Sequence, residues 1–224
     1  MSAKSEKGLH LHRVAIGLAG RRLLALDRLI SPGEVLTVMG PSGSGKSTLL
    51  AFVAGFLDPV FAAEGKVLID GEDVTGLAAE ERRLGLLFQD PLLFPHLSVG
   101  ANLLFGLDPA RAGRAERRRA VEAALAEVGM EGFFPRDPAT LSGGQKARIA
   151  LLRTLLARPR ALLLDEPFSR LDAELKGQVR DLVFEEAAKR GLPVLLVTHD
   201  PADAEAAGGP VIDLARGGQG GGKG

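Results

Sequence analysis

The stretch of sequence that decides the fold is Gly40-Pro41-Ser42-Gly43-Ser44-Gly45-Lys46-Ser47-Thr48. It fits the pattern G-x-x-x-x-G-K-[ST], whose glycines let the backbone curl so that successive N–H groups point at phosphate oxygens. The apolar run Val35–Met39 precedes it and is typical of a strand buried on both faces. A helix is expected from Lys46 to about Phe56, and its N-terminal dipole attracts anions. An accidental match in a Gly/Ser-rich linker is the alternative, which the flanking strand and helix disfavour.

The side chains of this loop and of a second motif predict a site for ATP and Mg²⁺. Lys46 is expected to reach the β- and γ-phosphates, and the Ser47 hydroxyl to bind Mg²⁺. The second motif places Asp165 and Glu166 after the apolar run Ala161–Leu164, at the carboxyl end of a strand, where open α/β sheets bind ligands. Asp165 is expected to hold Mg²⁺ through water, and Glu166 to act as general base on the attacking water. A solvated acidic turn is the alternative, which the phosphate loop disfavours.

Apolar patterning predicts strands that alternate with helices, and therefore an α/β fold with a mostly parallel sheet. Strands are expected at Leu9–Val14, Val35–Met39, Lys66–Ile69, Leu84–Phe88, Ala161–Leu164 and Val194–Thr198. Helices are expected at Lys46–Phe56, Val99–Leu107, Ala115–Val128, Gly144–Ala157, Leu171–Arg190 and Pro201–Ala207. The part from about Asp90 to Leu141 lacks a strong strand candidate and is interpreted as an inserted helical lobe. Met1–Gly8 is expected to be a disordered leader and Gly217–Gly224 a flexible tail.

Composition narrows the classes of function. The formal net charge is zero, so there is no electrostatic case for nucleic acid as a partner. Cysteine is absent, which excludes disulfides and thiolate chemistry. No stretch approaches the roughly 20 apolar residues of a membrane-spanning helix, and the leader lacks the apolar core of a signal peptide. A cytoplasmic location is expected, with any membrane work done through a separate partner chain.

A third motif is Leu141-Ser142-Gly143-Gly144-Gln145. Two glycines after a serine, just before an amphipathic helix, make a second candidate anion site at a helix start. One chain does not need two γ-phosphate sites for one nucleotide. On physical grounds alone, a plain helix N-cap formed by Ser142 is the better interpretation.

The three motifs in this order resemble the ATP-binding cassette (ABC) family, and the resemblance covers about Leu9 to Leu214. It implies a P-loop NTPase with a RecA-like core, an N-terminal antiparallel β subdomain and an inserted helical subdomain at about residues 90–143, within a domain of residues 9–216. It also implies that two cassettes sandwich two ATP molecules head to tail. The third motif of one copy (Ser142, Gly143, Gly144 and Gln145) then covers the nucleotide held by the other copy.

The resemblance assigns three further residues. Gln89 resembles the family's Q-loop glutamine, which contacts Mg²⁺ and the attacking water and senses the membrane partner. Asp172 resembles the D-loop aspartate, and His199 the switch histidine at the γ-phosphate. Each has a plain alternative: a polar residue at a strand end for Gln89, a helix cap for Asp172, and a structural loop histidine for His199.

The segment Leu87–Ser98 resembles binding-protein-dependent importers of the iron, sulfate, polyamine and thiamine type. This implies an integral membrane permease and a solute-binding protein as partners, and attachment to the inner face of the membrane through the permease. In such importers the region Gln89–Leu97 lines a groove that receives a helix of the permease, and Phe88 and Phe94 are candidate contacts or packing residues. The rival classes are an exporter or lipoprotein-release cassette, a soluble non-transport ABC ATPase and a non-catalytic regulator. No residue is expected to encode the solute.

Departures from the family pattern and unassigned polar residues complete the sequence picture. The family places an aromatic residue before the phosphate loop to stack on adenine, but the chain has no Tyr or Trp, and Leu18 or Ala19 offers apolar contact only. Weak selectivity for the base is therefore expected. The chain ends soon after Leu214, so control by an added C-terminal domain is not expected.

The other polar residues show no ligand spacing and are interpreted as surface or packing positions: His10, His12, His96, and a solvated helix face with Arg114, Arg117, Arg118 and Arg119.

Overall fold

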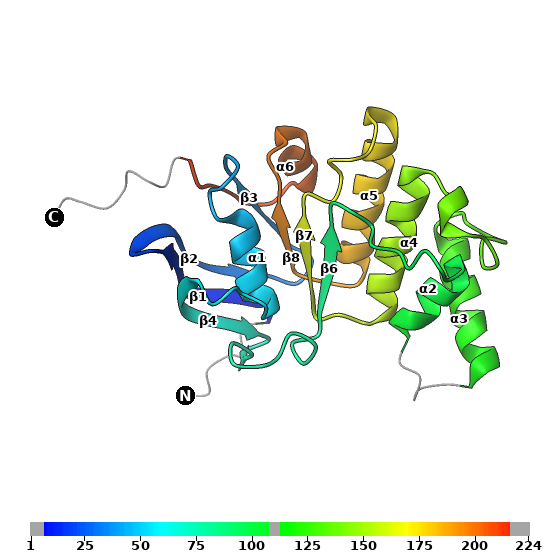
Figure 1. Cartoon of the computed structure of the whole chain (residues 1–224), viewed down its shortest axis with the longest axis horizontal. Coiled ribbons are helices and arrows are strands. Elements are labelled where there is room, and N and C mark those ends of the chain that lie inside the picture. Colours follow the sequence, from blue (N-terminus) through cyan, green and yellow to red (C-terminus); the bar gives the residue numbers. More distant parts are fainter. Residues whose placement is uncertain (1–6, 108–112, 216–224) are drawn as a thin grey trace. The chain divides into compact units, whose positions relative to one another are not determined.

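The computed structural model describes residues 7–107 and 113–215 of the chain, in a mixed α/β arrangement (Figure 1). The predicted α/β class is confirmed. The predicted tail, and the leader apart from Lys7 and Gly8, lie outside the described residues. The elements run in the order β1 (Leu9–Leu18), β2 (Arg21–Ile30), β3 (Val35–Met39), α1 (Lys46–Ala54), β4 (Phe61–Ile69), β5 (Glu72–Asp73), β6 (Leu84–Phe88), α2 (Val99–Gly106), α3 (Arg114–Glu127), a 3₁₀ turn (Pro138–Thr140), α4 (Gly143–Leu156), β7 (Ala161–Asp165), α5 (Ala173–Lys189), β8 (Val194–Val197), α6 (Pro201–Ala207) and β9 (Val211–Asp213).

Two compact units make up the chain, and each is described by itself. The first unit holds the described residues up to Leu84, together with Arg160–Glu166 and the residues from Phe184 onward. The second unit holds Gly85–Pro159 and Pro167–Val183. The helical lobe predicted for residues 90–143 falls within the second unit.

A parallel sheet forms the centre of the first unit. Strands β7, β8, β3 and β9 lie side by side in that order. Every residue of β8 is buried, as expected for a strand covered on both faces. Helix α1 packs against β7 and β8 (Figure 1). In register, Val38 lies opposite Val197, which lies opposite Asp165, so the carboxyl ends of three strands meet at one edge.

An antiparallel sheet in the order β2-β1-β4-β5 completes the first unit (Figure 1). The family resemblance implied such a subdomain, but patterning missed β2 and β5 and ended β1 too early. Strand β2 was missed because Leu23–Leu26 is a continuous apolar run that shows no alternation. A β-bulge interrupts β1, because two residues, His12 and Arg13, face the single residue Asp27 of β2.

The bulge moves the buried face of β1 by one residue. Leu9 and Leu11 are buried before it, and Val14 and Ile16 are buried after it. Arg13 takes a positive φ of 48° at this point. Strand β4 pairs with the other side of β1, and its residue Gly65 lies beside the bulge with a φ of 93°. A Cβ at Gly65 would come within 2.3 Å of the Arg13 carbonyl oxygen. Only glycine fits this approach of the two backbones.

Helices α2, α3 and α4 fill much of the second unit around one apolar core. The bounds of α2, α3 and α4 differ from the predicted bounds by no more than one residue at each end. Ser98 caps α2 by accepting a hydrogen bond from the Ala101 amide at 3.2 Å. The core is formed by Val99, Leu103, Val121, Leu125, Met130, Ile149 and Leu152. Among the helices of the described residues, none is long and apolar enough to cross a membrane.

Candidate functional site

The Gly40–Thr48 loop connects β3 to α1 in the first unit. Gly43 and Gly45 adopt left-handed φ values of 78° and 91°, which curl the loop as the sequence pattern predicts. Gly45 is the N-cap of α1 and gives it no side-chain cap. The first intrahelical bond runs from the Leu49 amide to the Gly45 carbonyl at 2.8 Å. The N–H groups of the first helical turn therefore remain available to an anion.

Ser44 carries an orphaned polar atom inside this loop. Its Oγ is buried and has no hydrogen-bond partner among the described residues. A Cβ at Gly40 would lie 2.8 Å from that oxygen, so only glycine leaves the hydroxyl its space. A buried hydroxyl without a partner costs free energy, and a phosphate oxygen can accept its proton. The sequence motif includes Ser44 only as a variable position, so this fit was visible only in the structure.

Lys46 is only 7% exposed although it carries a charge. Its Nζ donates to the carbonyl oxygens of Gly40 and Pro41 at 2.8 and 2.9 Å. Carbonyl groups are neutral, so these bonds orient the ammonium without cancelling its charge. A buried cation held in this way is suited to bind a polyanion such as the phosphate chain of a nucleotide.

Ser47 and Asp165 meet beside the loop. The Ser47 Oγ donates to the Asp165 Oδ1 at 3.3 Å, across 118 residues of sequence. Burial, and secondarily the charge of Glu166, raise the pKa of Asp165, although the Ser47 hydrogen bond and the charge of Lys46 act to lower it. A hydroxyl and a carboxylate are hard oxygen ligands, so both fit Mg²⁺. A bound cation would also relieve the electrostatic cost of this partly buried carboxylate.

The Asp165→Asn variant is expected to separate stability from ligand binding. Because the folded-state pKa of Asp165 is raised above its unfolded value, its ionisation costs stability that appears as the pH rises from the unfolded pKa to the folded one. The variant should therefore gain thermal stability over the wild type as the pH rises from about 4 to 7, yet bind Mg·ATP at least about tenfold more weakly. Thermal melts across pH and nucleotide titrations test both parts. The exposed Asp181→Asn variant is the control, and a variant that binds Mg·ATP like the wild type would contradict the ligand role.

Glu166 and His199 form a pair at the same edge of the sheet. The His199 Nδ1 lies 3.1 Å from the Glu166 Oε1. Glu166 has a positive φ of 47°, which is costly for a residue with a side chain and is typical of functional positions. Its amide donates to the Val197 carbonyl at 2.9 Å, which fixes the strained backbone.

The residue before His199 anchors its loop. Thr198 is buried, and its Oγ1 donates to the Asp203 Oδ2 at 2.9 Å. The same Oγ1 accepts a hydrogen bond from the Asp200 amide at 3.1 Å. His199 is thus held between an anchored threonine and the N-cap of α6. The sequence analysis did not predict the hydrogen bond between Thr198 and Asp203. The Thr-His-Asp run followed by Asp203 is only a weak indication of a helix cap.

The remaining predicted site residues lie in the second unit. Gln89 is exposed and directly follows β6. Ser142 and Gln145 form a reciprocal capping box at the start of α4, with bonds of 3.0 and 3.3 Å. A Cβ at Gly144 would lie 3.3 Å from Leu175, so close packing alone favours glycine there. Asp172 accepts from the Leu175 amide at 3.0 Å and caps α5. Ser142 and Asp172 therefore cap α4 and α5, as the alternative interpretations proposed. These hydrogen bonds hold the backbone at the two helix starts.

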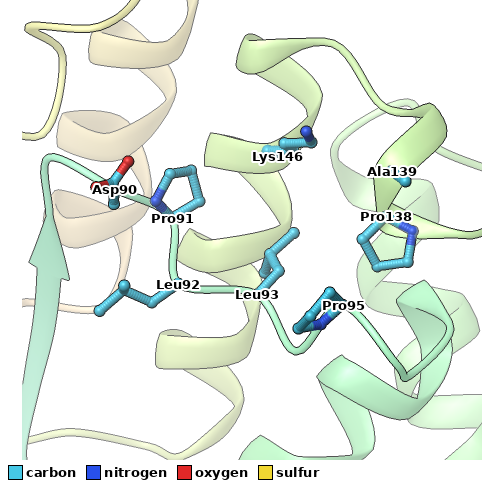
Figure 2. A pocket seen from close by; sticks show the side chains of 8 residues that line it. All are labelled: Asp90, Pro91, Leu92, Leu93, Pro95, Pro138, Ala139 and Lys146. Atoms are coloured by element: carbon cyan, nitrogen blue, oxygen red, sulfur yellow. The ribbon is translucent and has the colours of Figure 1, made fainter.

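A pocket of about 420 Å³ lies in the second unit beside the segment after Gln89 (Figure 2). Three prolines and two leucines give it a mainly apolar lining, while one acidic and one basic residue lie at its sides. Arg153 braces the segment by donating to the Leu92 carbonyl at 2.9 Å. The pocket is lined by Asp90, Pro91, Leu92, Leu93, Pro95, Pro138, Ala139 and Lys146.

The hairpin of β1 and β2 approaches the phosphate loop. A Cβ at Gly45 would lie 3.2 and 3.4 Å from Leu24 and Leu23 of β2. At the hairpin turn, Leu18 is 36% exposed and Ala19 has a positive φ of 49°. Leu18 pairs with Phe61 of β4, which puts one aromatic residue on the strand next to it. The sequence analysis had not predicted an aromatic residue beside Leu18.

A glycine-rich loop between a buried strand and a helix start, with carboxylates at the end of another parallel strand of the same sheet, defines a P-loop nucleotide-binding protein. Comparison with known proteins narrows the class. The family model described as ABC transporter matches residues 24–169. The chain belongs to this family, and it is an ATP-binding protein and an ATPase of the ABC-transporter type.

Three relatives illustrate the family. The uncharacterized ABC transporter ATP-binding protein YnjD of Escherichia coli (strain K12) is 47% identical over 209 residues, which cover 93% of this chain and 95% of the relative. The thiamine import ATP-binding protein ThiQ of Cereibacter sphaeroides is 48% identical over 88% of this chain and 83% of the relative. The Fe(3+) ions import ATP-binding protein FbpC of Escherichia coli O157:H7 is 42% identical over 86% of this chain and 54% of the relative. The predicted resemblance to importer-type cassettes is confirmed.

Proposed function

We propose that the chain energises the import of a solute through a separate membrane permease. The observation that carries the proposal is the site at one edge of the first unit, where Lys46, the Ser47–Asp165 contact and the Glu166–His199 pair gather at the ends of three neighbouring strands. Relatives named as thiamine and Fe(3+) import ATP-binding proteins support the direction of transport.

The residues of the first unit have distinct roles in this proposal. Lys46 and the amides at the start of α1 bind the phosphates, and the Ser44 hydroxyl donates to a phosphate oxygen. Ser47 and Asp165 hold Mg²⁺, which neutralises negative charge on the phosphates. Glu166 accepts a proton from the attacking water. His199 orients the Glu166 carboxylate through their 3.1 Å contact and is placed to hold the γ-phosphate.

The second unit supplies the residues that complete the site in the proposed dimer. Ser142, Gly143, Gly144 and Gln145 of one copy face the nucleotide of the other copy. The support is physical: the amides at the start of α4 attract an anion, and the capping box keeps this helix start rigid. Gln89 then contacts Mg²⁺ and water, and Asp172 contacts the opposite copy. These roles rest on the family resemblance.

The pocket beside Gln89 is the proposed docking site for a helix of the permease. Its apolar lining (Figure 2) fits an amphipathic helix. The hydrogen bond from Arg153 to the Leu92 carbonyl helps to hold the lining segment in place. This docking places the chain at the cytoplasmic face of the membrane as a peripheral subunit. A solute-binding protein would act through the permease and does not need to touch this chain.

Co-purification with membrane proteins tests the proposal. We expect the full chain, expressed from its natural genetic neighbourhood, to co-purify with an importer-type permease, whose presence changes the ATPase rate. A Leu92→Asp substitution in the pocket should release the permease and leave the basal ATPase rate unchanged. Recovery of an exporter or lipoprotein-release complex, or of a soluble assembly without a permease, would overturn the importer assignment.

Base selectivity gives a separate prediction. Because Leu18 and Ala19 offer no stacking ring, wild-type protein should bind ATP and GTP with affinities within about threefold of each other. The Leu18→Tyr variant should bind both purine nucleotides about fivefold more tightly, since one stacking contact contributes about 1 kcal/mol. Nucleotide titration measures both effects, with the exposed Val60→Tyr variant as the control. A strong ATP preference in the wild type would contradict the prediction.

A further inference from the structure

Two histidines and one aspartate converge on the outer face of the antiparallel sheet. His10 and His12 are two residues apart on β1, so their side chains emerge on the same face. Leu9 and Leu11 are buried on the opposite face. Asp27 comes from the neighbouring strand β2, at the position that faces the bulge. Sequence spacing did not reveal this cluster because its third member lies on another strand.

The Asp27 carboxylate reaches both rings. Its Oδ1 lies 3.1 Å from the His10 Nε2, and its Oδ2 lies 3.7 Å from the His12 Nδ1. The two rings meet edge to face, with centroids 5.2 Å apart. One nitrogen of each histidine and one oxygen of Asp27 all lie within 4.8 Å of one another. Three ligand atoms of the types that divalent transition metals prefer are therefore gathered at one point.

We propose that His10, His12 and Asp27 form a binding site for a divalent transition metal ion of the Zn²⁺ type. Tetrahedral Zn²⁺ holds its ligands at about 2.0–2.1 Å, which places the ligand atoms about 3.3 Å from one another. The distance of 3.1 Å between the His10 Nε2 and the Asp27 Oδ1 is close to that spacing, whereas the 3.7 Å contact of the His12 Nδ1 is to the other oxygen, Oδ2. Because the three candidate ligand atoms lie within 4.8 Å of one another, any remaining pair needs an adjustment of at most about 1.5 Å, which rotation of a half-exposed histidine ring supplies. A fourth position on the solvent side is open to water.

The electrostatics of the cluster agree with this assignment. The hydrogen bond from His10 lowers the pKa of Asp27, and the His12 ring and the Arg13 amide act in the same direction. The carboxylate is therefore ionised and ready to bind a cation. Two basic side chains at adjacent positions are engaged elsewhere: Lys66 binds Asp73 at 2.9 Å, and Arg28 binds Glu34 at 3.1 Å. These ion pairs keep Lys66 and Arg28 from competing with the histidines for the Asp27 carboxylate.

The register of β1 and β2 is what makes the third ligand available. Leu11 pairs with Arg28, so the next position in the same register brings Asp27 opposite His12, and the bulge follows directly after this point. A metal ion bound at this point would connect β1 to β2. Because β2 also carries Leu23 and Leu24, which pack beside Gly45, the ion would stabilise the hairpin that lies against the phosphate loop.

Zinc titration of the full chain without a histidine tag, in excess Mg²⁺, tests the proposal. We expect one Zn²⁺ per chain by calorimetry and a rise in melting temperature of a few degrees. His12→Gln and Asp27→Asn should each weaken Zn²⁺ binding at least about tenfold, while their melting temperatures without Zn²⁺ stay close to that of the wild type. His12 is 40% exposed, so its replacement is tolerated by the fold.

Two further variants make the result decisive. His96→Gln removes an exposed histidine outside the cluster and should leave Zn²⁺ binding unchanged. His199→Gln removes the histidine of the ATP site and should also leave it unchanged. Absence of Zn²⁺ binding by the wild type would overturn the proposal. Full affinity in the His12→Gln and Asp27→Asn variants would also overturn it, because it would place the ion elsewhere.

Discussion

Replacement of Glu166 by glutamine is expected to lower ATP turnover by about 10²–10⁴-fold, the usual contribution of a general base. An amide cannot take a proton from the attacking water. Glutamine has the same shape, so it should keep the contact with His199, and the backbone strain at φ 47° does not change. Binding of ATP should therefore be close to that of the wild type, since phosphate contacts from Lys46 and α1 remain.

Steady-state ATPase assays and equilibrium ATP binding measure the two quantities separately. The same variant should accumulate as an ATP-bound dimer in size-exclusion chromatography, because the proposed dimer forms around bound ATP and this variant hydrolyses the ATP slowly. Glu205→Gln, an identical change at an exposed glutamate of α6, is the matched control and should hydrolyse ATP like the wild type. Turnover of the Glu166→Gln variant at the wild-type rate would show that the base is another group.

Replacement of Arg82 by methionine is expected to cost about 3–5 kcal/mol of unfolding free energy, because several hydrogen bonds to a charged group are lost and each buried carbonyl left without a donor costs about 1–3 kcal/mol. Arg82 is only 4% exposed, and its guanidinium donates to four backbone carbonyls. Two of them, those of Phe52 and Val53, belong to the last turn of α1 and lie 2.9 and 2.8 Å from Nη1. Methionine fills similar space but removes all four hydrogen bonds; the Phe52 carbonyl keeps the Gly55 amide at 3.2 Å, whereas the Val53 carbonyl loses its guanidinium donor.

Arg82 therefore acts as the C-terminal cap of the helix that begins at the phosphate loop. Burial lowers the pKa of Arg82, and the charge of Asp73 partly offsets this, yet the group stays charged at neutral pH. Gly55 makes room for the guanidinium, because a Cβ there would lie 2.6 Å from the Arg82 Nε. Loss of this cap should loosen α1 and weaken ATP binding as well as stability.

Urea unfolding of Arg82→Met and of the neighbouring exposed Arg83→Met gives a matched comparison. The Arg83 variant should lie within about 0.5 kcal/mol of the wild type, as is usual for surface substitutions. The Arg82→Lys variant should have an unfolding free energy between those of the Arg82→Met and Arg83→Met variants, because one ammonium keeps the charge but cannot reach four carbonyls. Equal unfolding midpoints for the Arg82→Met and Arg83→Met variants would refute the capping role.

The sequence alone determined the parts of this protein whose signals are local. A contiguous loop motif, apolar runs such as Val194–Val197 and capping residues such as Ser142 and Asp172 depend on neighbouring residues in the chain, so patterning located them to within a few positions. The order of the motifs was also sufficient to indicate the family. Strand β2 was missed because its leucines follow neither a helical nor a strand period, and its role depends on pairing with β1 and not on its own pattern.

Only the tertiary structure decided the features that join residues far apart in the chain. The phosphate loop could be read from the sequence, but the contact of Ser47 with Asp165, the pairing of Glu166 with His199 and the capping of α1 by Arg82 could not. The cluster of His10, His12 and Asp27 is the clearest case, because the antiparallel register of β1 and β2 sets which residue of β2 faces the histidines. Such contacts depend on strand register and chain crossover, which a local pattern does not encode.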